Sequence, residues 1–188
     1  MKLTPSLIAV LTLLIAGCSK SEPDLGEIKN GEYHNRFFGL TVSLPPDWEV
    51  LDRKNWPDNK PEIHLFMIFQ PDSPLHSVNL SYTAYDLQSR PEILTGADFL
   101  ASAKNDLTGV FKNMYPDLPI TQDIITHDIG GRRFEVMRTN ATKNNVTLHE
   151  IMAVTVIRSY ALVFMGKYRT DEEVNTIQQV LDSITFDH

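Results

Sequence analysis

The chain has 188 residues, 42% of them hydrophobic and 22% charged, and its formal net charge at pH 7 is −7. This composition is ordinary for a globular protein and does not indicate disorder. The acidic balance and the lack of a dense basic run argue against a protein that binds nucleic acid through its phosphates, and against electrostatic attraction to anionic lipid.

Residues 1–17 predict a lipoprotein signal peptide. A positive end at Lys2 precedes an apolar run over residues 7–16, which is much shorter than the roughly 20 residues needed to cross a bilayer. The sequence Ile15-Ala16-Gly17-Cys18 resembles the lipobox of bacterial lipoproteins. That resemblance implies cleavage before Cys18, attachment of diacylglycerol to its sulfur, and acylation of the new amino terminus by a fatty acid such as palmitate. The alternatives are a secretory peptide with an incidental cysteine and a buried N-terminal helix.

The lipidation of Cys18 decides where we expect the protein to reside. Cys18 is the only cysteine of the chain, so no thiol is left for a disulfide or a zinc site. Ser19, rather than Asp, follows it, which resembles the outer-membrane sorting pattern of Gram-negative bacteria. We therefore expect a protein of the cell envelope, held by its lipid anchor at the outer membrane and facing the periplasm. In a Gram-positive organism it would lie outside the cytoplasmic membrane.

Residues 18–30 are the lipidated cysteine and a predicted tether. The stretch is polar, contains Ser, Pro and Gly, and shows no apolar period, which favours a flexible coil. The alternative is a short strand or helix docked on the domain. The remaining residues, 31–188, have the size of one domain with one core.

The first half of this domain predicts strands and then a helix. Residues 40–44 alternate between apolar and polar side chains and are followed by Pro45-Pro46, which stops a strand. Residues 63–70 and 77–87 are β-rich. The run 63–69 is apolar on both faces, as in a central strand covered on two sides. A helix starts at Thr95, with Asp98 placed to complement the cap and a buried stripe between residues 99 and 111.

The second half predicts a four-stranded meander and a closing helix. Residues 120–167 contain turn signals at Gly130-Gly131, Asn144-Asn145 and Arg158-Ser159. Thr170 and Glu173 form a capping box that opens the last helix. We therefore expect an α+β fold, in which an antiparallel β-sheet has helices packed on both faces.

Three segments resemble the Mog1/PsbP-like superfamily. They are FFGLTVSLPPDW at residues 37–48, a Gly-Arg-Arg-Phe-Glu strand that opens at Gly131, and a closing helix that ends Ser-Ile-Thr-Phe at residues 183–186. The resemblance implies a three-layer α/β/α sandwich around an antiparallel sheet. It also implies a protein that binds other proteins, since the superfamily shares no catalytic residues that could be transferred to this chain.

The sequence contains few signs of chemistry. No G-x-S-x-G, H-E-x-x-H or Gly-rich phosphate loop occurs, and His149-Glu150 begins like a zinc-protease motif that lacks its second histidine at Ala153. We expect no enzyme activity, no metal and no cofactor. A Ser, His and Asp trio that comes together only in the folded chain is the alternative.

The polar loop at residues 52–61 holds our candidate partner-binding residues, Arg53, Lys54 and Trp56. Trp and Arg are enriched at binding hot spots, and this tryptophan lies between prolines in a charged segment. The alternative is that Trp56 is tucked under its own loop. Trp48, by contrast, is expected to fold over the edge of the core.

These features together predict a membrane-anchored, non-enzymatic protein-interaction module. Its partner would be another envelope protein, and not a nucleic acid. Two alternatives remain: an envelope assembly factor that binds a small molecule or lipid between a helix and the sheet, and an uncharacterised hydrolase.

Overall fold

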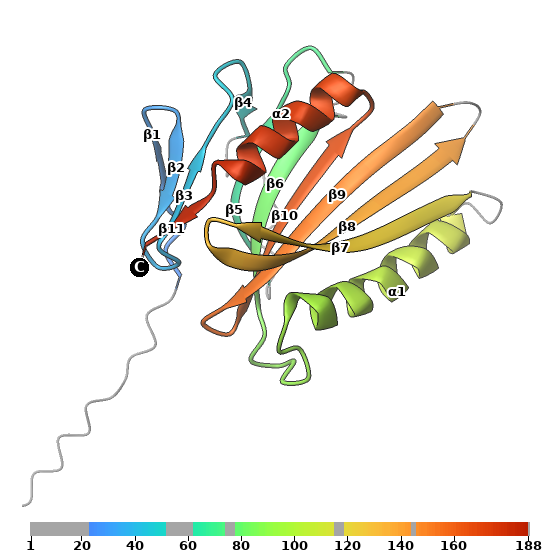
Figure 1. Cartoon of the computed structure of the whole chain (residues 1–188), viewed down its shortest axis with the longest axis horizontal. Helices are drawn as coiled ribbons and strands as arrows, with labels where there is room; N and C mark the ends of the chain where they lie inside the picture. The colour runs from blue at the N-terminus through green and yellow to red at the C-terminus, as the bar shows by residue number, and fades with distance from the viewer. Residues whose placement is uncertain (1–22, 52–61, 74–77, 115–118, 144–145, 188) are drawn as a thin grey trace, which may run out of the picture.

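The computed structural model describes residues 23–51, 62–73, 78–114, 119–143 and 146–187 (Figure 1). Cys18, Arg53, Lys54 and Trp56 lie outside these ranges. Along the chain the elements are β1 (Glu27–Lys29), β2 (Glu32–Asn35), β3 (Leu40–Ser43), β4 (Glu49–Val50), β5 (Glu62–Phe69), β6 (Asn79–Asp86), α1 (Gly96–Met114), β7 (Ile120–Ile129), β8 (Arg132–Lys143), β9 (Val146–Ile157), β10 (Tyr160–Tyr168), α2 (Asp171–Asp182) and β11 (Thr185–Phe186).

The main sheet has seven antiparallel strands in the order β4-β5-β6-β10-β9-β8-β7. The four strands β7 to β10 form the predicted meander. Its last strand, β10, pairs with β6, so that the first strand of the meander lies at the edge of the sheet. The mostly antiparallel architecture with two helices is therefore confirmed.

The two helices contact different side chains of the sheet. Leu162 and Phe164 of β10 belong to a large core cluster that includes Ile177, Val180 and Leu181 of α2. Ala161 and Val163 of the same strand belong to a second cluster that includes Leu100 of α1. Successive side chains of a strand point to opposite faces, so α1 and α2 pack against alternate residues of β10.

A second sheet, which the sequence did not predict, joins the two ends of the domain. Its order is β1-β2-β3-β11, and β11 pairs with β3 through Thr185 opposite Thr41. Figure 1 shows this small sheet at one end of the molecule, next to the C-terminus. Trp48, as expected, packs partly buried against the neighbouring core.

The expected tether over residues 18–30 is corrected by the structure at its C-terminal end. Residues 27–29 form β1 and pair with β2. Just before them, Asp24 accepts hydrogen bonds from the backbone N–H of Gly26 at 2.8 Å and of Phe37 at 3.1 Å, and its carbonyl oxygen accepts one from Asn35 at 2.8 Å. These contacts attach residues 24–29 to the domain, because a segment that pairs its own backbone groups is no longer a free coil.

The predicted helix starts and turns are confirmed where the structure describes them. Thr170 accepts from the backbone N–H of Glu173, whose carboxylate accepts in turn from Thr170 N–H, as a capping box requires. Gly130 and Gly131 have φ of 57° and 76° and form a two-residue turn between Ile129 and Arg132. The turn at Asn144-Asn145 lies outside the described residues.

Candidate interaction surface

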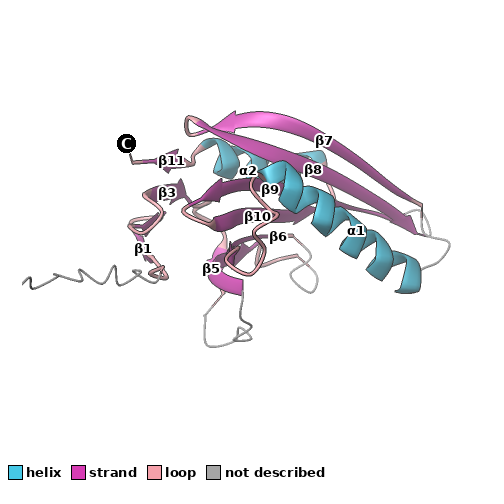
Figure 2. Cartoon of the chain, turned by 90° about the horizontal axis from the view of Figure 1, so that it is seen from below, coloured by secondary structure: helices cyan, strands magenta, loops and turns pink. Residues whose placement is uncertain are grey.

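Strand β7 is a long free edge of the main sheet. It has ten residues and pairs with β8 on one side only, and Figure 2 shows it along the rim of the sheet. Most of its side chains are exposed, including those of Ile124 at 42% and Ile125 at 39%. An edge strand of this kind presents unpaired N–H and C=O groups that can bind another strand.

Natural edge strands usually carry a feature that prevents such pairing, such as charged side chains, Pro or a bulge. The sequence of β7, ITQDIITHDI, has two charged side chains, Asp123 and Asp128, but no Lys, Pro or Gly. Its register with β8 is continuous from Ile120 opposite Ala141 to Ile129 opposite Arg132, so no bulge twists the edge away. Ten backbone positions in regular extended geometry therefore remain along this edge.

A hollow of about 300 Å³ lies on the α2 side of β7. Its lining includes Ile125, His127 and Ile129 of β7 and Leu181 of α2. The ring of His127 lies 3.8 Å from the carboxylate of Asp182, which fixes the end of α2 near the edge strand. The lining is apolar with polar ends, a composition that suits the side chains of an added strand.

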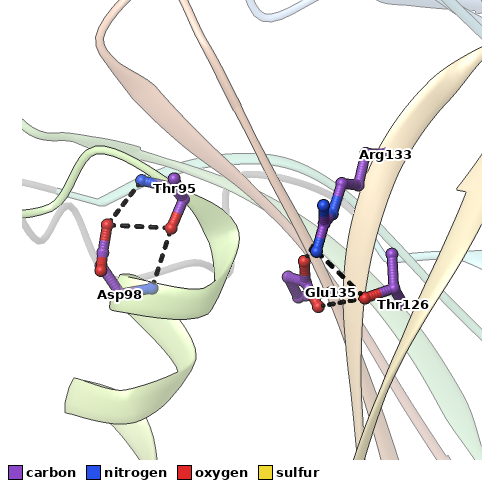
Figure 3. A network of polar contacts seen from close by, with 5 residues as sticks. All are labelled: Thr95, Asp98, Thr126, Arg133 and Glu135. Atoms are coloured by element: carbon purple, nitrogen blue, oxygen red, sulfur yellow. Dashed lines mark hydrogen bonds and ion pairs between the residues drawn. The ribbon is translucent and has the colours of Figure 1, made fainter.

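A larger cleft of about 550 Å³ lies beside the start of α1, where the sequence led us to expect a space between a helix and the sheet. Figure 3 shows Thr95, Arg133 and Glu135 from its lining, together with their hydrogen-bond partners Asp98 and Thr126. Glu135 accepts from Arg133 at 2.8 Å and from Thr126 at 2.9 Å, and Asp98 accepts from the Thr95 hydroxyl at 2.8 Å. The hydrogen bond from the Thr95 hydroxyl, together with those from the backbone N–H groups of Leu94 and Thr95, lowers the pKa of Asp98.

Each polar side chain drawn in Figure 3 thus has a partner inside the protein. A ligand that entered this cleft would have to compete with these hydrogen bonds.

A third hollow, also of about 550 Å³, lies between Trp48 and α2 and has Asp47, Asp72 and Glu172 on its walls. Its acidic lining would favour a cation or a basic peptide.

The pair His149-Glu150, which the sequence singled out, lies in β9 and contacts sheet neighbours. The ring of His149 stacks on Tyr168 at 5.0 Å between centroids, and its Nδ1 contacts the side-chain oxygen of Asn140. Burial raises the pKa of Glu150, and the nearby Lys167 opposes that shift. Within the described ranges, no three His, Cys, Asp or Glu side chains lie close enough together to hold a metal ion.

The described part of the chain has no helix that is both long and apolar enough to cross a membrane. The candidate partner residues Arg53, Lys54 and Trp56 fall between β4 and β5 in the sequence and lie outside the described residues. Our sequence reading did not identify β7 as a surface.

Comparison with known proteins gives a likeness of fold. The solution structure of CyanoP, the cyanobacterial PsbP of Synechocystis sp. PCC 6803, aligns with a TM-score of 0.60 and 15% identity, over 86% of this chain and 96% of that one. The fold is PsbP-like. The PsbP-like expectation from the sequence is thus supported at the level of fold, while the lipobox stays a prediction.

Two more distant structures also align with this PsbP-like chain. LpqN of Mycobacterium tuberculosis, described as involved in cell envelope biogenesis, gives a TM-score of 0.43 and 12% identity over 79% of this chain and 83% of its own. A protein of Bacteroides thetaiotaomicron VPI-5482 gives 0.48 and 12%, over 80% of this chain and 46% of its own. No protein-family model and no curated protein matches the sequence.

Proposed function

We propose that this chain is a lipid-anchored, non-enzymatic protein-interaction module of the cell envelope, and that it binds protein through the free edge of β7. The observation that carries this proposal is the free ten-residue edge, in unbroken register, with its two exposed isoleucines. Main-chain hydrogen bonds at such an edge supply affinity, and the flanking side chains supply specificity. The PsbP-like fold, with α1 and α2 as outer layers of a sandwich around the main sheet, would hold this edge rigid.

The anchor is the second part of the proposal. Cys18 would carry the lipid, and the domain is held from Asp24 onward. Six residue steps at roughly 3.3–3.6 Å each span at most about 20 Å. The domain would therefore act close to the membrane surface, on partners at the periplasmic side of the outer membrane. Metabolic labelling with an alkyne fatty acid tests the anchor, and label that persists in Cys18→Ala would contradict it.

The test of the binding edge compares two exposed apolar residues at opposite edges of the main sheet. Ile124 of β7 is 42% exposed and Val50 of β4 is 46% exposed. We would purify the full-length protein from crosslinked cells as wild type, Ile124→Lys and Val50→Lys. Lysine on an edge strand opposes strand addition. The expected result is that Ile124→Lys loses its crosslinked species and Val50→Lys keeps them. Equal recovery from both variants would contradict the proposed edge.

The segment with Arg53, Lys54 and Trp56, which connects β4 to β5 in the sequence, is proposed as a separate contact. Its test is Trp56→Ala in the same crosslinking experiment. Loss of a species that Ile124→Lys retains would show that this segment and β7 bind different partners. Unchanged recovery would remove this segment from the proposal.

The cleft beside α1 favours a second candidate function, the binding of a small molecule or lipid. Its volume of about 550 Å³ is within the range of ligand pockets. A bound ligand must raise the melting temperature of the protein, since it stabilises only the folded state. A thermal-shift screen of metabolites and lipids tests this candidate, and a screen without any stabilising compound argues against it.

A further inference from the structure

We infer that β7 pairs antiparallel with β7 of a second copy of this chain, so that Ile125 of each copy lies opposite the other across the twofold axis. This inference rests on the proposed function, because it names the partner of the same edge. It follows from three properties of the strand: the direction of its backbone groups, the registers that twofold symmetry allows, and the side chains that each register brings together.

The first step is to find which backbone groups of β7 point outward. Thr142 donates its N–H to the carbonyl oxygen of Pro119 at 3.4 Å, so residue 119 faces β8. The two-residue turn at Gly130-Gly131 is closed by Ile129 and Arg132, which in such a turn exchange both hydrogen bonds. Both observations assign the odd-numbered residues of β7 to the ladder with β8. The even-numbered residues therefore direct their N–H and C=O groups to the free edge.

The second step is symmetry. A twofold axis perpendicular to the sheet leaves each side chain on its own face. A residue can then pair only with a residue of the same parity in the partner, because neighbours along a strand point to opposite faces. One residue must therefore lie opposite its own copy, with the axis midway between the two. The three choices near the centre of β7 are Ile124, Ile125 and Thr126.

The third step compares the side chains that meet. With the axis at Ile125, the two Ile125 side chains meet, and Asp123 lies opposite the partner's His127 on both sides of them. With the axis at Ile124, Asp123 would lie opposite the partner's Ile125. With the axis at Thr126, Ile124 would lie opposite the partner's Asp128. Apolar pairs stabilise cross-strand contacts, and the Asp123 carboxylate can accept a hydrogen bond from an imidazole N–H, so the register with Ile125 on the axis is favoured. The contact of the His127 ring with Asp182 of its own copy, at 3.8 Å, uses Nε2 and leaves Nδ1 for the partner.

This register also satisfies the outward backbone groups. Ile124 would exchange hydrogen bonds with the partner's Thr126, and Gln122 with the partner's Asp128, each occurring twice by symmetry. All four residues are even-numbered and so face the free edge. The main sheets of the two copies would then join into one continuous sheet, which removes the longest exposed edge of each.

Disulfide formation in the full-length protein, in membranes, tests this register. Ile125 lies directly opposite itself in a pair without backbone hydrogen bonds, where Cα atoms are about 4.5 Å apart, and a disulfide needs about 4.4–6.8 Å. Ile125→Cys should therefore give a dimer on mild oxidation. Asp123→Cys should not, because its two copies would lie about 14 Å apart along the strands. Asp123→Cys combined with His127→Cys should restore the dimer.

Two controls set the background. Leu94→Cys places a thiol on a side chain that is 74% exposed and lies before α1, outside β7, so it reports random collision. The unchanged chain reports any dimer formed through Cys18. We expect at least a tenfold excess of dimer for Ile125→Cys over both controls. A yield at the level of Leu94→Cys overturns the inference, as does stronger crosslinking from Ile124→Cys than from Ile125→Cys.

The same experiment separates this inference from the proposed function. A crosslinked species from Ile125→Cys that contains one copy of this chain and a different protein overturns self-pairing, while it supports protein binding at the β7 edge. A dimer yield from Ile125→Cys at the level of the controls, together with hetero-species that Ile124→Lys removes, would also overturn the inference and would leave protein binding at this edge standing.

Discussion

The two halves of the main sheet, on either side of β10, end in different ways. On one side β6 and β5 are followed by β4, an edge of two described residues. On the other side β9 and β8 are followed by β7, an edge of ten residues in unbroken register. A two-residue edge offers little backbone for another strand, whereas β7 offers five outward-facing positions.

The interiors of the two halves differ as well. The β4 side is packed with aromatic rings, in which Tyr82 stacks on Phe164 at 3.8 Å and lies near Phe66. The β7 side carries buried or half-buried polar groups, among them Glu135 and Glu150. Aromatic burial stabilises the fold itself. The aromatic packing thus concentrates on the β4 side, away from the edge at which we propose binding.

The largest expected effect concerns the turn that leads from β7 into β8. A Cβ at Gly130 would lie 2.5 Å from the carbonyl oxygen of Ile184, whereas a Cβ at Gly131 meets nothing within 4 Å. Both residues have positive φ, which costs an L-residue about 1–2 kcal/mol. Overpacking adds about 1–3 kcal/mol at Gly130 alone. We expect urea unfolding to show a loss of about 3 kcal/mol for Gly130→Ala and about 1 kcal/mol for Gly131→Ala. Equal losses would mean that contact with Ile184 is unimportant.

The next prediction uses proline to test which N–H groups of β7 face β8. Asp123→Pro removes an N–H from the ladder with β8, which should lower the free energy of unfolding by about 1–3 kcal/mol. Ile124→Pro removes an outward N–H, so the fold should keep its stability. Two lost hydrogen bonds of about 1 kcal/mol each should instead weaken the dimer about thirtyfold. Urea denaturation would measure the stability of the fold, and analytical ultracentrifugation would measure the proposed dimer. The reverse pattern would contradict the assignment.

A smaller effect, of opposite sign, is expected in the aromatic half. The hydroxyl of Tyr82 is buried and has no hydrogen-bond partner among the described residues. Burial, followed by the charge of Tyr33, raises its pKa. Tyr82→Phe should raise the free energy of unfolding by about 1 kcal/mol, because it removes a desolvated polar group. Tyr33→Phe is the matched control: its hydroxyl donates to Leu25 and accepts from Asn35. That variant should lose about 1 kcal/mol. A destabilised Tyr82→Phe would indicate a partner for this hydroxyl.

The smallest effect is a pH dependence in the polar half. Burial raises the pKa of Glu150 in the folded state, while Lys167 opposes the shift. Between the ordinary pKa of a glutamate and this raised value, the folded state binds more protons than the unfolded state. The free energy of unfolding therefore falls as the pH rises through that window. Glu150→Gln should reduce this slope and be more stable at pH 7, as measured by urea unfolding between pH 4 and 7. The exposed Glu27→Gln serves as the control.

The sequence by itself predicted the local features of the fold. Turns at Gly130-Gly131 and Arg158-Ser159, the caps at Thr95 and Thr170, and the alternation of strands depend on residues within a few positions of one another. Such signals can be read without the tertiary structure. The α+β class and the PsbP-like likeness also followed from short segments. The anchor at Cys18 and the contact loop around Trp56 remain predictions.

Only the tertiary structure decided which strand lies at the edge. The sequence predicted a meander over 120–167. A period of two in each strand does not tell which end of that meander joins the rest of the sheet and which end is left as its edge. The pairing of Leu162 opposite Ala84, between strands distant in sequence, attaches β10 to β6 and leaves β7 free. The small sheet was missed for the same reason, since Thr41 and Thr185 meet across most of the chain. Such pairings depend on how the whole core packs, and a period of two in each strand does not specify them.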